Sequence, residues 1–474
     1  MKIRHVIDGH EADSLDGATY DDIDPFTRSS YATVARGSEK DADLAVAAAR
    51  QAFDTGPWPR MGFAERGRLL HRFADLIDQH AAEFADAETR DMGKPITEAT
   101  GHDIPRAAYN LRFFADHARL SASESLPSDT AHHVYVRYES AGVVAAIAPW
   151  NYPLMLATWK IAPALAWGNT VVLKPAEDTP RSAALLGRLA LEAGIPEGVL
   201  NVVLGHGPVG AALTRHPDVD RITFTGSSAT GRAISAAAAH HLTPVSLELG
   251  GKGAAVVFND ANLDSAVEWT IKAAFNNTGQ ICLAGSRLYV QHGIYDEFLS
   301  RFKTATEQLR LGDPSDRETQ IGPLASAQHF AKVTSYLEDE ALGGGQIVTG
   351  GYDHDWFVRP TVVVDVPSDS LIQRDEVFGP VVTVTPFRTE QEGVDLANST
   401  PYGLSAMAFT DNLHRAHRVA AGLRSGNVWI NCFFVRDLRA PFGGVGDSGT
   451  GREGGTFSRE FFTEPKSVTM RIDT

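Results

Sequence analysis

The chain has 474 residues, of which 43% are apolar and 22% charged, and this length accommodates about three globular domains. Its formal charge of -16 disfavours binding to nucleic acid or to anionic membrane surfaces. Two cysteines cannot build a disulfide framework, the first residues lack the apolar core of a signal peptide, and no apolar run is long enough to span a bilayer. We therefore expect a cytoplasmic protein.

The first part of the chain is rich in helical patterns. Apolar residues recur with helical spacing over residues 41–53, 64–85 and 104–118. Residues 132–139 then alternate between the two faces of an extended chain, which predicts a half-buried or edge strand.

From residue 142 onward, short apolar runs alternate with helical segments. The predicted strands lie at residues 142–148, 170–173, 200–204, 221–224 and 254–258, with helices at 180–193 and 209–215. Strands that alternate with helices pair in parallel, so we expect an α/β fold with a doubly wound sheet. Ligands of such a sheet lie at the carboxyl ends of its strands.

A second α/β region is predicted from about residue 253 to 445. Its helices are expected at residues 264–276, 295–310 and 413–423. Near the end of the chain, residues 466–472 alternate again and predict a strand. Together with the strand at 132–139 it can form a small sheet for subunit contact, because exposed strand edges invite pairing.

Glycine-rich turns are the first candidates for cofactor binding. The pattern G-x-G-x-x-G occurs at residues 205–210 and again at 444–449, and only the first lies between a predicted strand and a helix. Residues 224–231 also end a strand and open a helix, whose free N–H groups can hold a pyrophosphate. The alternative is an ordinary capped helix start. A Walker loop is excluded, because Arg232 follows this turn where lysine and a hydroxyl residue are required.

Lys174 and Glu177 follow the predicted strand at 170–173 and are candidates to bind ribose hydroxyls. A carboxylate at this place repels a 2'-phosphate and so selects NAD over NADP. The alternative interpretation is a solvated pair of loop residues.

Cys282 lies within a run of small and amide side chains at residues 276–287. Such neighbours leave room for a substrate, whereas a cysteine that fills a core usually lies among branched aliphatic residues. Inert packing is the alternative, since free cysteine is among the most buried residue types. Cys432, among the bulky residues 428–434, is expected to be such a packing residue.

Four motifs resemble the aldehyde dehydrogenase superfamily over nearly the whole chain. They are Cys282 in GQIC, Glu248 in LELGGK, Asn151 in PWNYP, and Glu376 with Phe378 in EVFGP, in the family's order and spacing. The resemblance implies a Rossmann-like cofactor domain, an α/β catalytic domain and a small oligomerisation β-sheet, assembled as a homodimer or homotetramer.

The resemblance also implies domain boundaries. We expect residues 1–118 and 140–250 to form the NAD-binding domain and residues 251–448 the catalytic domain. Residues 119–139 and 449–474 are then the oligomerisation segments.

The chemistry explains why these residue types are needed. An aldehyde has no leaving group, so a nucleophile must first form a tetrahedral adduct from which hydride departs. The resemblance assigns Cys282 as that nucleophile, and the Asn151 amide with the Cys282 backbone N–H as donors to the oxyanion. Glu248 is the expected base that activates water to cleave the resulting thioester.

NAD is the cofactor that the resemblance implies. Its adenosine and pyrophosphate side is expected to contact Trp150, Lys174, Glu177, Gly226 and Ser227. Glu376 is expected to hold the nicotinamide ribose, and Phe378 to pack against the ring. By the same resemblance, the glycine loop at 205–210 does not hold the pyrophosphate.

The segment 434–444 looks like the branch that oxidises hydroxymuconic semialdehydes and related carboxylated aldehydes. Arg106, Arg436 and Arg439 match arginines of that branch, and a guanidinium can hold a carboxylate with two parallel hydrogen bonds. The alternatives are a neutral aldehyde as substrate, a solvated Arg436–Asp437 ion pair, and a domain contact for Arg439. Thr278 stands where relatives often have glutamine, and we expect it to reshape the pocket near the thiol.

Two hypotheses of other classes compete with this one. A cofactor-independent thiol esterase would use Cys282 and Glu248 without NAD. A non-catalytic structural oligomer is expected to lack Cys282, Glu248 or Asn151, and all three are present. We expect no metal site, because His414 and His417 share a helix face without an evident third ligand.

Overall fold

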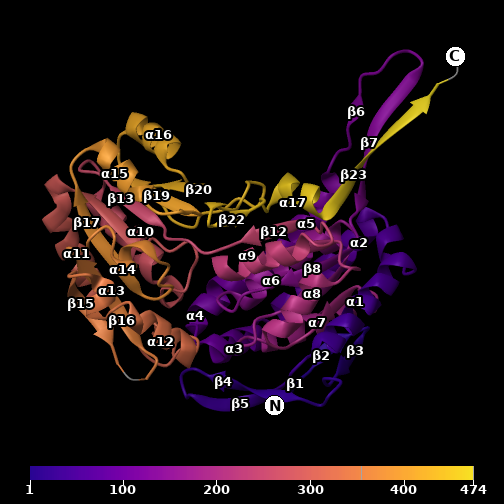
Figure 1. Ribbon diagram of the computed structural model, residues 1–474, viewed down its shortest axis with the longest axis horizontal. Helices are drawn as coiled ribbons and strands as arrows, with labels where there is room; N and C mark the ends of the chain where they lie inside the picture. The colour runs from indigo at the N-terminus through magenta and orange to yellow at the C-terminus, as the bar shows by residue number, and fades with distance from the viewer. Residues whose placement is uncertain (354, 473–474) are drawn as a thin grey trace.

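A computed structural model describes residues 1–353 and 355–472. Figure 1 shows two α/β lobes side by side and a narrow arm that projects from one of them. Within the described residues, no helix combines the length and apolarity needed to cross a membrane.

The first lobe is built on an eight-stranded sheet. Its strand order is β22 (Gly449–Thr450), β12 (Val245–Glu248), β11 (Arg221–Thr225), β8 (Val143–Ile147), β9 (Thr170–Lys174), β10 (Leu200–Val202), β2 (His5–Ile7) and β3 (His10–Ala12). The strands from β12 to β10 run parallel, whereas the outer pairs β22–β12, β10–β2 and β2–β3 are antiparallel. The predicted doubly wound sheet is therefore present.

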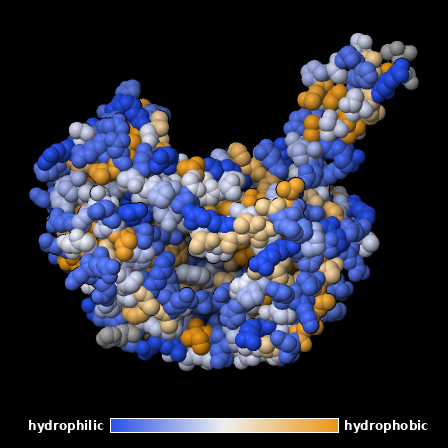
Figure 2. Space-filling view, viewed as in Figure 1, coloured by the Kyte–Doolittle hydropathy of each residue, from blue (hydrophilic) through white to orange (hydrophobic). Residues whose placement is uncertain are grey.

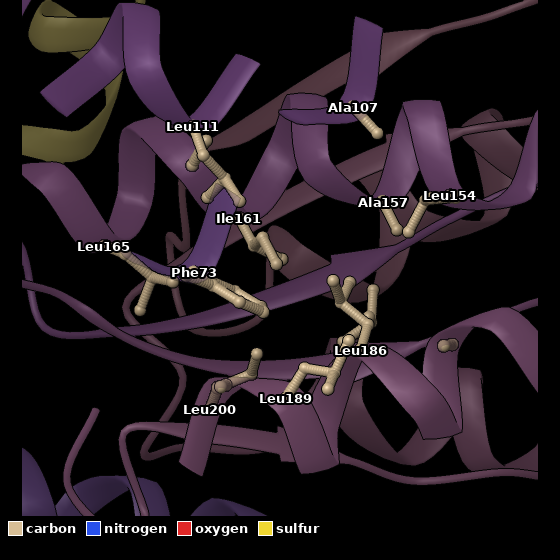
Figure 3. Close-up of a cluster of buried hydrophobic side chains, with 14 of the residues drawn as sticks. Phe73, Ala107, Leu111, Leu154, Ala157, Ile161, Leu165, Leu186, Leu189 and Leu200 are labelled. Carbon is tan, nitrogen blue, oxygen red and sulfur yellow. The ribbon is translucent and has the colours of Figure 1, made fainter. Parts of the chain in front are cut away.

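Helices cover both faces of this sheet, which explains why its central strands are continuous apolar runs. One face carries α1 (Glu39–Asp54), α8 (Gly207–Arg215) and α9 (Ser228–Ala238); the other carries α2 (Phe63–Gln79), α5 (Ile104–Leu120), α6 (Pro153–Ala166) and α7 (Arg181–Glu192). Successive residues of β8 alternate between the two cores: Val143 and Ala145 face one, and Val144 and Ala146 the other. Figure 3 shows the second core, where side chains of α2, α5, α6 and α7 meet.

The second lobe is built on a seven-stranded sheet. Its order is β15 (Gln346–Tyr352), β16 (Val358–Val364), β17 (Val381–Phe387), β14 (Arg287–Gln291), β13 (Ala254–Val257), β19 (Ser405–Phe409) and β20 (Asn427–Ile430), with only β15 antiparallel. The helices α10 (Leu263–Phe275) and α11 (Tyr295–Glu307) contribute to one core, and α15 (Glu390–Ala397) and α16 (Leu413–Gly422) to another. The smaller helices α12 (Ala327–Ser335), α13 (Asp339–Leu342) and α14 (Leu371–Arg374) surround a further cluster.

Several elements differ from the sequence predictions. The helical pattern at 64–85 belongs to two helices, because α2 ends at Gln79 and α3 (Ala81–Met92) starts after a break at His80. Helix α6 has no amphipathic stripe to reveal it, since it is enclosed between the sheet and α5 and nearly all its residues are buried. The N-terminal strands β1 (Lys2–Ile3), β4 (Thr19–Asp24) and β5 (Ser29–Ala35) form a separate sheet that no pattern predicted.

The arm is a three-stranded antiparallel sheet of β6 (Ser125–Leu126), β7 (His132–Ser140) and β23 (Thr463–Arg471). All nine residues of β7 pair with β23, which confirms the predicted pairing of two segments far apart in the sequence. The C-terminal strand begins at Thr463, whereas the pattern indicated residue 466. The preceding helix α17 (Gly455–Phe462) packs on the body against α5 and α6. The division into domains stays a prediction.

Candidate active site

The segment that leads to Cys282 begins where helix α10 ends. The turn Asn276–Gly279 has φ angles of 51° at Asn277, 55° at Thr278 and 70° at Gly279. Non-glycine residues rarely adopt this left-handed conformation, so the turn must be held by its surroundings. It reverses the chain and brings the half-buried Cys282 to the wall of a cavity of about 600 Å³.

The environment of Cys282 keeps its thiol protonated at rest. Burial, followed by the carboxylates of Glu376 and Glu248, raises the pKa of Cys282 to about 12. The nearby Arg436 guanidinium acts in the opposite direction. A proton acceptor is therefore needed before the sulfur can attack a carbonyl. Cys432 instead packs against the hydrophobic core of the second lobe.

Asn151 lies in the loop after β8 and is only 4% exposed. Its Nδ2 donates a hydrogen bond of 2.9 Å to the Gln280 carbonyl, two residues before Cys282. Asn277 Nδ2 in turn donates to the Asn151 carbonyl at 2.9 Å. One N–H of the Asn151 amide is thus anchored, and the second remains for a ligand in the cavity that Asn151 and Cys282 both line.

Glu248 ends strand β12 and is 4% exposed. Neither of its carboxylate oxygens has a hydrogen-bond partner among the described residues. Burial, and next the charge of Glu453, raise the pKa of Glu248 well above its ordinary value, against the effect of Lys160 and Arg436. A buried carboxyl without a hydrogen-bond partner, whose charge acts on the Cys282 thiol, is a candidate proton acceptor.

A buried ion pair underlies Glu248. Lys160 Nζ donates to Glu453 Oε1 at 3.2 Å and to the Thr223 hydroxyl at 3.1 Å, and Trp159 Nε1 donates to Glu453 Oε2. Lys160 and Glu453 are 293 residues apart, so only the tertiary structure reveals this pair.

The nucleotide-site candidates line two adjoining cavities. The cavity at Cys282 shares walls with a second one of about 430 Å³, which lies at the carboxyl ends of the first sheet's strands. The seven predicted cofactor residues all line one or both cavities: Trp150, Lys174, Glu177, Gly226, Ser227, Glu376 and Phe378. The two cavities together have room for a dinucleotide, so the residues present fit NAD.

Lys174 and Glu177 form an ion pair of 3.2 Å beside the second cavity. Burial raises the pKa of Glu177, but the charge and hydrogen bond of Lys174, a backbone hydrogen bond and the charge of His206 together outweigh it and lower this pKa overall. The carboxylate therefore stays ionised at neutral pH, as a ribose-binding acceptor requires.

Both glycine turns contribute to these walls. Ser227 caps helix α9, and its side chain accepts a hydrogen bond from the Thr230 N–H. The turn at residues 224–231 is therefore also an ordinary capped helix start, which was the alternative to a pyrophosphate site. Gly207 and Gly210, from the pattern at 205–210, lie on α8 in the wall of the second cavity.

Glu376 and Phe378 form the opposite wall. Glu376 Oε1 accepts a hydrogen bond of 2.7 Å from the Gly251 N–H. Phe378 has a φ of 66°, and its carbonyl lies 2.8 Å from His329 Nε2. The rings of His329 and Phe378 pack against Trp150 at centroid distances of 4.8 and 5.4 Å. Burial lowers the pKa of His329 to about 4, so it is neutral. None of the sequence motifs indicated His329.

Two of the three candidate arginines meet at Trp159. Arg436 lies over the rings of Phe442 and Trp159 at 3.8 and 4.8 Å, and Arg106 lies 6.0 Å from Trp159. Arg436 Nη2 has no hydrogen-bond partner in the described part of the chain. Burial, and next the charge of Arg106, lower the pKa of Arg436 to about 9, which leaves it cationic at neutral pH.

Arg439 lies elsewhere, with its side chain 76% exposed and paired with Asp437 at 2.5 Å. The alternative of a solvated Arg436–Asp437 pair is therefore wrong, because Arg436 turns inward to the aromatic rings. The Thr278 side chain is buried and is not among the described lining residues of the cavity at Cys282, and its hydroxyl accepts a hydrogen bond from the Gly322 N–H at 3.2 Å. Its effect on the shape of the pocket stays a prediction.

This arrangement is that of an α/β enzyme whose nucleotide-sized cleft ends at a cysteine thiol. The family model described as "Aldehyde dehydrogenase family" matches residues 12–468. The chain belongs to the aldehyde dehydrogenase family. The family and the fold class expected from the motifs are thereby confirmed.

Relatives cover almost the full length of the chain. The 2-hydroxymuconic semialdehyde dehydrogenase of Pseudomonas sp. (strain CF600) is 45% identical over 99% of this chain and 100% of its own length. The human 2-aminomuconic semialdehyde dehydrogenase is 45% identical over 95% of each chain. The solved structure of an indole-3-acetaldehyde dehydrogenase from P. syringae, in complex with NAD+, is 40% identical, with a TM-score of 0.98 over 100% of this chain and 97% of that one.

Proposed function

We propose that this enzyme oxidises a carboxylated semialdehyde of the hydroxymuconic type to the carboxylic acid, with NAD as cofactor and Cys282 as nucleophile. The observation that carries the proposal is that Cys282 and Asn151 line a cleft of dinucleotide size, with the buried Glu248 carboxylate close enough for its charge to act on the Cys282 thiol. The semialdehyde dehydrogenases among its relatives and the NAD complex of a structural neighbour support it.

In the mechanism, Glu248 or water takes the thiol proton and the Cys282 sulfur forms a bond to the aldehyde carbon. The oxyanion accepts hydrogen bonds from the free N–H of the Asn151 amide and from the Cys282 backbone. NAD, when bound, supplies the acceptor for the hydride that leaves this carbon. Any proton that Glu248 took from the thiol first passes to solvent. Glu248 then removes a proton from water, whose oxygen attacks the thioester carbon; the C–S bond breaks, and the departing Cys282 sulfur regains a proton as the acid is released.

Trp150, Lys174, Glu177, Gly226 and Ser227 hold the adenosine and pyrophosphate part of the cofactor in this proposal. Glu376 binds the nicotinamide ribose, and Phe378, supported by His329, packs on the ring.

The charge of Glu177 sets the preference for NAD. In Glu177→Gln, we expect the efficiency with NADP relative to NAD to rise about tenfold, because the carboxylate no longer repels a 2'-phosphate. Steady-state kinetics with both cofactors measures this ratio. Asp178→Asn is the matched control, since Asp178 lines the same cavity and forms no ion pair with Lys174. An unchanged ratio in Glu177→Gln would assign the selectivity to another group.

Arg436 and Arg106 are the proposed binding residues for the substrate carboxylate. In Arg436→Gln, kcat/KM for a carboxylated aldehyde is expected to fall about 10- to 150-fold relative to that for a neutral aldehyde, which corresponds to a lost charge-assisted hydrogen bond of about 1.5–3 kcal/mol. The ratio of the two substrates is the measurement, because any effect of Arg436 on the Cys282 thiol is common to both.

Arg439→Gln is the comparison for this experiment, because Arg439 is exposed and already paired with Asp437. We expect it to change the ratio less than about threefold. A larger carboxylate-specific loss in Arg439→Gln than in Arg436→Gln would move the carboxylate site to the protein surface. Equal losses for both kinds of aldehyde in Arg436→Gln would favour a neutral substrate.

The arm is the proposed subunit contact. Its outer strand β23 has no neighbouring strand on its other side among the described residues. On the arm, Leu126 of β6, Met470 of β23 and the following Ile472 expose apolar side chains, and Figure 2 shows hydrophobic residues along the arm. We propose a homodimer or homotetramer assembled through this sheet, with residues 1–118 and 140–250 as the NAD-binding domain and 251–448 as the catalytic domain. The cytoplasmic location stays a prediction.

A further inference from the structure

We propose that Glu98 is a positioning residue for the oxyanion-binding amide of Asn151 and acts on it through Asn277. This inference rests on the role proposed above for Asn151. Glu98 ends the short helix α4 (Ile96–Glu98), and 179 residues separate it from Asn277 in the sequence. None of the motifs considered in the sequence analysis includes Glu98.

The turn at 277–279 needs an external support. Three consecutive residues have positive φ angles, and two of them, Asn277 and Thr278, are not glycine. Isolated asparagine residues tolerate this conformation, but a run that includes threonine is rare, because the Cβ atom crowds the backbone. Strain of this kind persists only where surrounding contacts hold it, and it is concentrated at functional sites.

Glu98 supplies such a contact at the start of the turn. Both of its carboxylate oxygens accept the Asn277 N–H, each at 2.9 Å. The side-chain amide of Asn277 contacts the active site, because its Nδ2 donates to the carbonyls of Asn151 at 2.9 Å and Gln280 at 3.2 Å. The Asn151 amide is in turn anchored on the Gln280 carbonyl. Three hydrogen-bonded steps therefore connect Glu98 to the oxyanion donor.

The other supports of this turn are uncharged. Thr278 Oγ1 accepts from the Gly322 N–H, and Gly279 packs so closely on Gly379 that a side chain would lie 2.3 Å from its carbonyl oxygen. Among the described contacts, Glu98 is the one carboxyl group that binds the turn. Burial raises the pKa of Glu98 to about 7, against the Asn277 hydrogen bond and Lys94, so it is ionised above that pH and partly ionised near it. Hydrogen bonds to the ionised acceptor are about twice as strong as neutral ones.

The charges around Glu98 leave it available for this role. The nearby Lys94 pairs with Asp103 and lies 3.7 Å from Glu88, so its cation is already bound by two other carboxylates. Glu98 is followed directly by a π-helical turn, Ala99–Asp103, and such turns are frequent at functional sites.

Glu98 is also reachable from outside the active site. It lines a separate cavity of about 630 Å³ together with Phe275 and Asn276, and the described walls of this cavity include none of the residues that line the cleft at Cys282. A small carboxylate can therefore reach the position of the Glu98 side chain without entering the cleft.

The experiment compares Glu98→Ala, Glu98→Gln, Asn151→Ala and the double variant Glu98→Ala/Asn151→Ala in the full-length enzyme. We expect Glu98→Ala to lower kcat/KM about tenfold or more, with the dissociation constant of NAD changed less than about twofold. Glu98→Gln keeps an acceptor oxygen for Asn277 and is expected to recover activity to within about threefold of the wild type. Should the alanine variant fail to fold, Glu98→Met, which keeps the length of the side chain but has no oxygen to accept the Asn277 N–H, carries the same comparison, alone and with Asn151→Ala.

Coupling and chemical rescue distinguish positioning from a general structural role. In the Asn151→Ala background, Glu98→Ala is expected to lower kcat/KM less than about twofold, because the amide that Glu98 positions is already absent. Acetate, which supplies the methylene and carboxylate that Glu98→Ala removes, is expected to restore part of the activity. Wild type at the same acetate concentration corrects for inhibition. Glu268→Ala is the matched control, since Glu268 lines the same cavity and pairs with Lys272.

The outcomes separate this inference from the proposed function. A clear loss for Asn151→Ala, combined with an equal cost of Glu98→Ala in both backgrounds and no rescue by acetate, would overturn the positioning role alone. Wild-type activity of Glu98→Ala would do the same. An unchanged rate for Asn151→Ala would overturn its oxyanion role, and the inference about Glu98 with it.

Discussion

Cys282→Ala is expected to lose NADH formation from any aldehyde, a fall of at least about 10³-fold, because no other side chain at this place can form the covalent adduct. The variant should still bind NAD and melt near the wild-type temperature, since a half-buried thiol contributes little to the core. Absorbance of NADH under saturating substrate measures the loss.

Cys432→Ala is the matched control for the thiol. Cys432 is the second cysteine of the chain; like Cys282 it is half-buried against the core of the second lobe, but it does not line the cavity at Cys282. Its replacement is expected to change the rate less than about twofold, with at most a modest loss of stability. Substantial turnover in Cys282→Ala, or a complete loss in Cys432→Ala, would contradict the assignment of the nucleophile.

Glu248→Gln is expected to separate the two halves of the reaction. Hydride transfer needs the sulfur and the oxyanion donors, so about one NADH per active site should form in a rapid burst. The amide cannot take a proton from water, and steady-state turnover should then fall about 10²- to 10⁴-fold. Stopped-flow absorbance resolves the two phases. A steady state equal to that of the wild type would remove Glu248 from thioester cleavage.

The same variant tests the pH dependence of hydrolysis. Burial raises the pKa of Glu248 well above its ordinary value, so the base is present above that raised pKa and is lost by protonation as the pH falls through it. For this reason, the steady-state rate of the wild type is expected to decline as the pH falls. The slow steady-state rate of Glu248→Gln is expected to show no such acid limb in its pH profile. Persistence of an identical limb in the glutamine variant would assign the titration to another group.

Much of the architecture follows from local patterns in the sequence. The central strands β8, β9 and β11 are short apolar runs because helices cover both faces of their sheet, and this arrangement is typical of parallel sheets. Helix α1 was predicted from its periodic spacing, since one of its faces packs on the sheet. Helix α6, enclosed on all sides, has no periodic contrast and was missed.

Motifs of fixed spacing identified the family and singled out Cys282 and the residues that line the two cavities, because such motifs contain that information locally. Only the tertiary structure decided that Arg436 faces inward while Arg439 pairs with Asp437, and that Lys160 pairs with Glu453 behind Glu248. It alone brought Glu98 to the turn before Cys282. The physical reason is that the energies of these contacts depend on burial and on partners up to 293 residues away, and no local pattern of side chains specifies which distant group will lie within hydrogen-bonding distance.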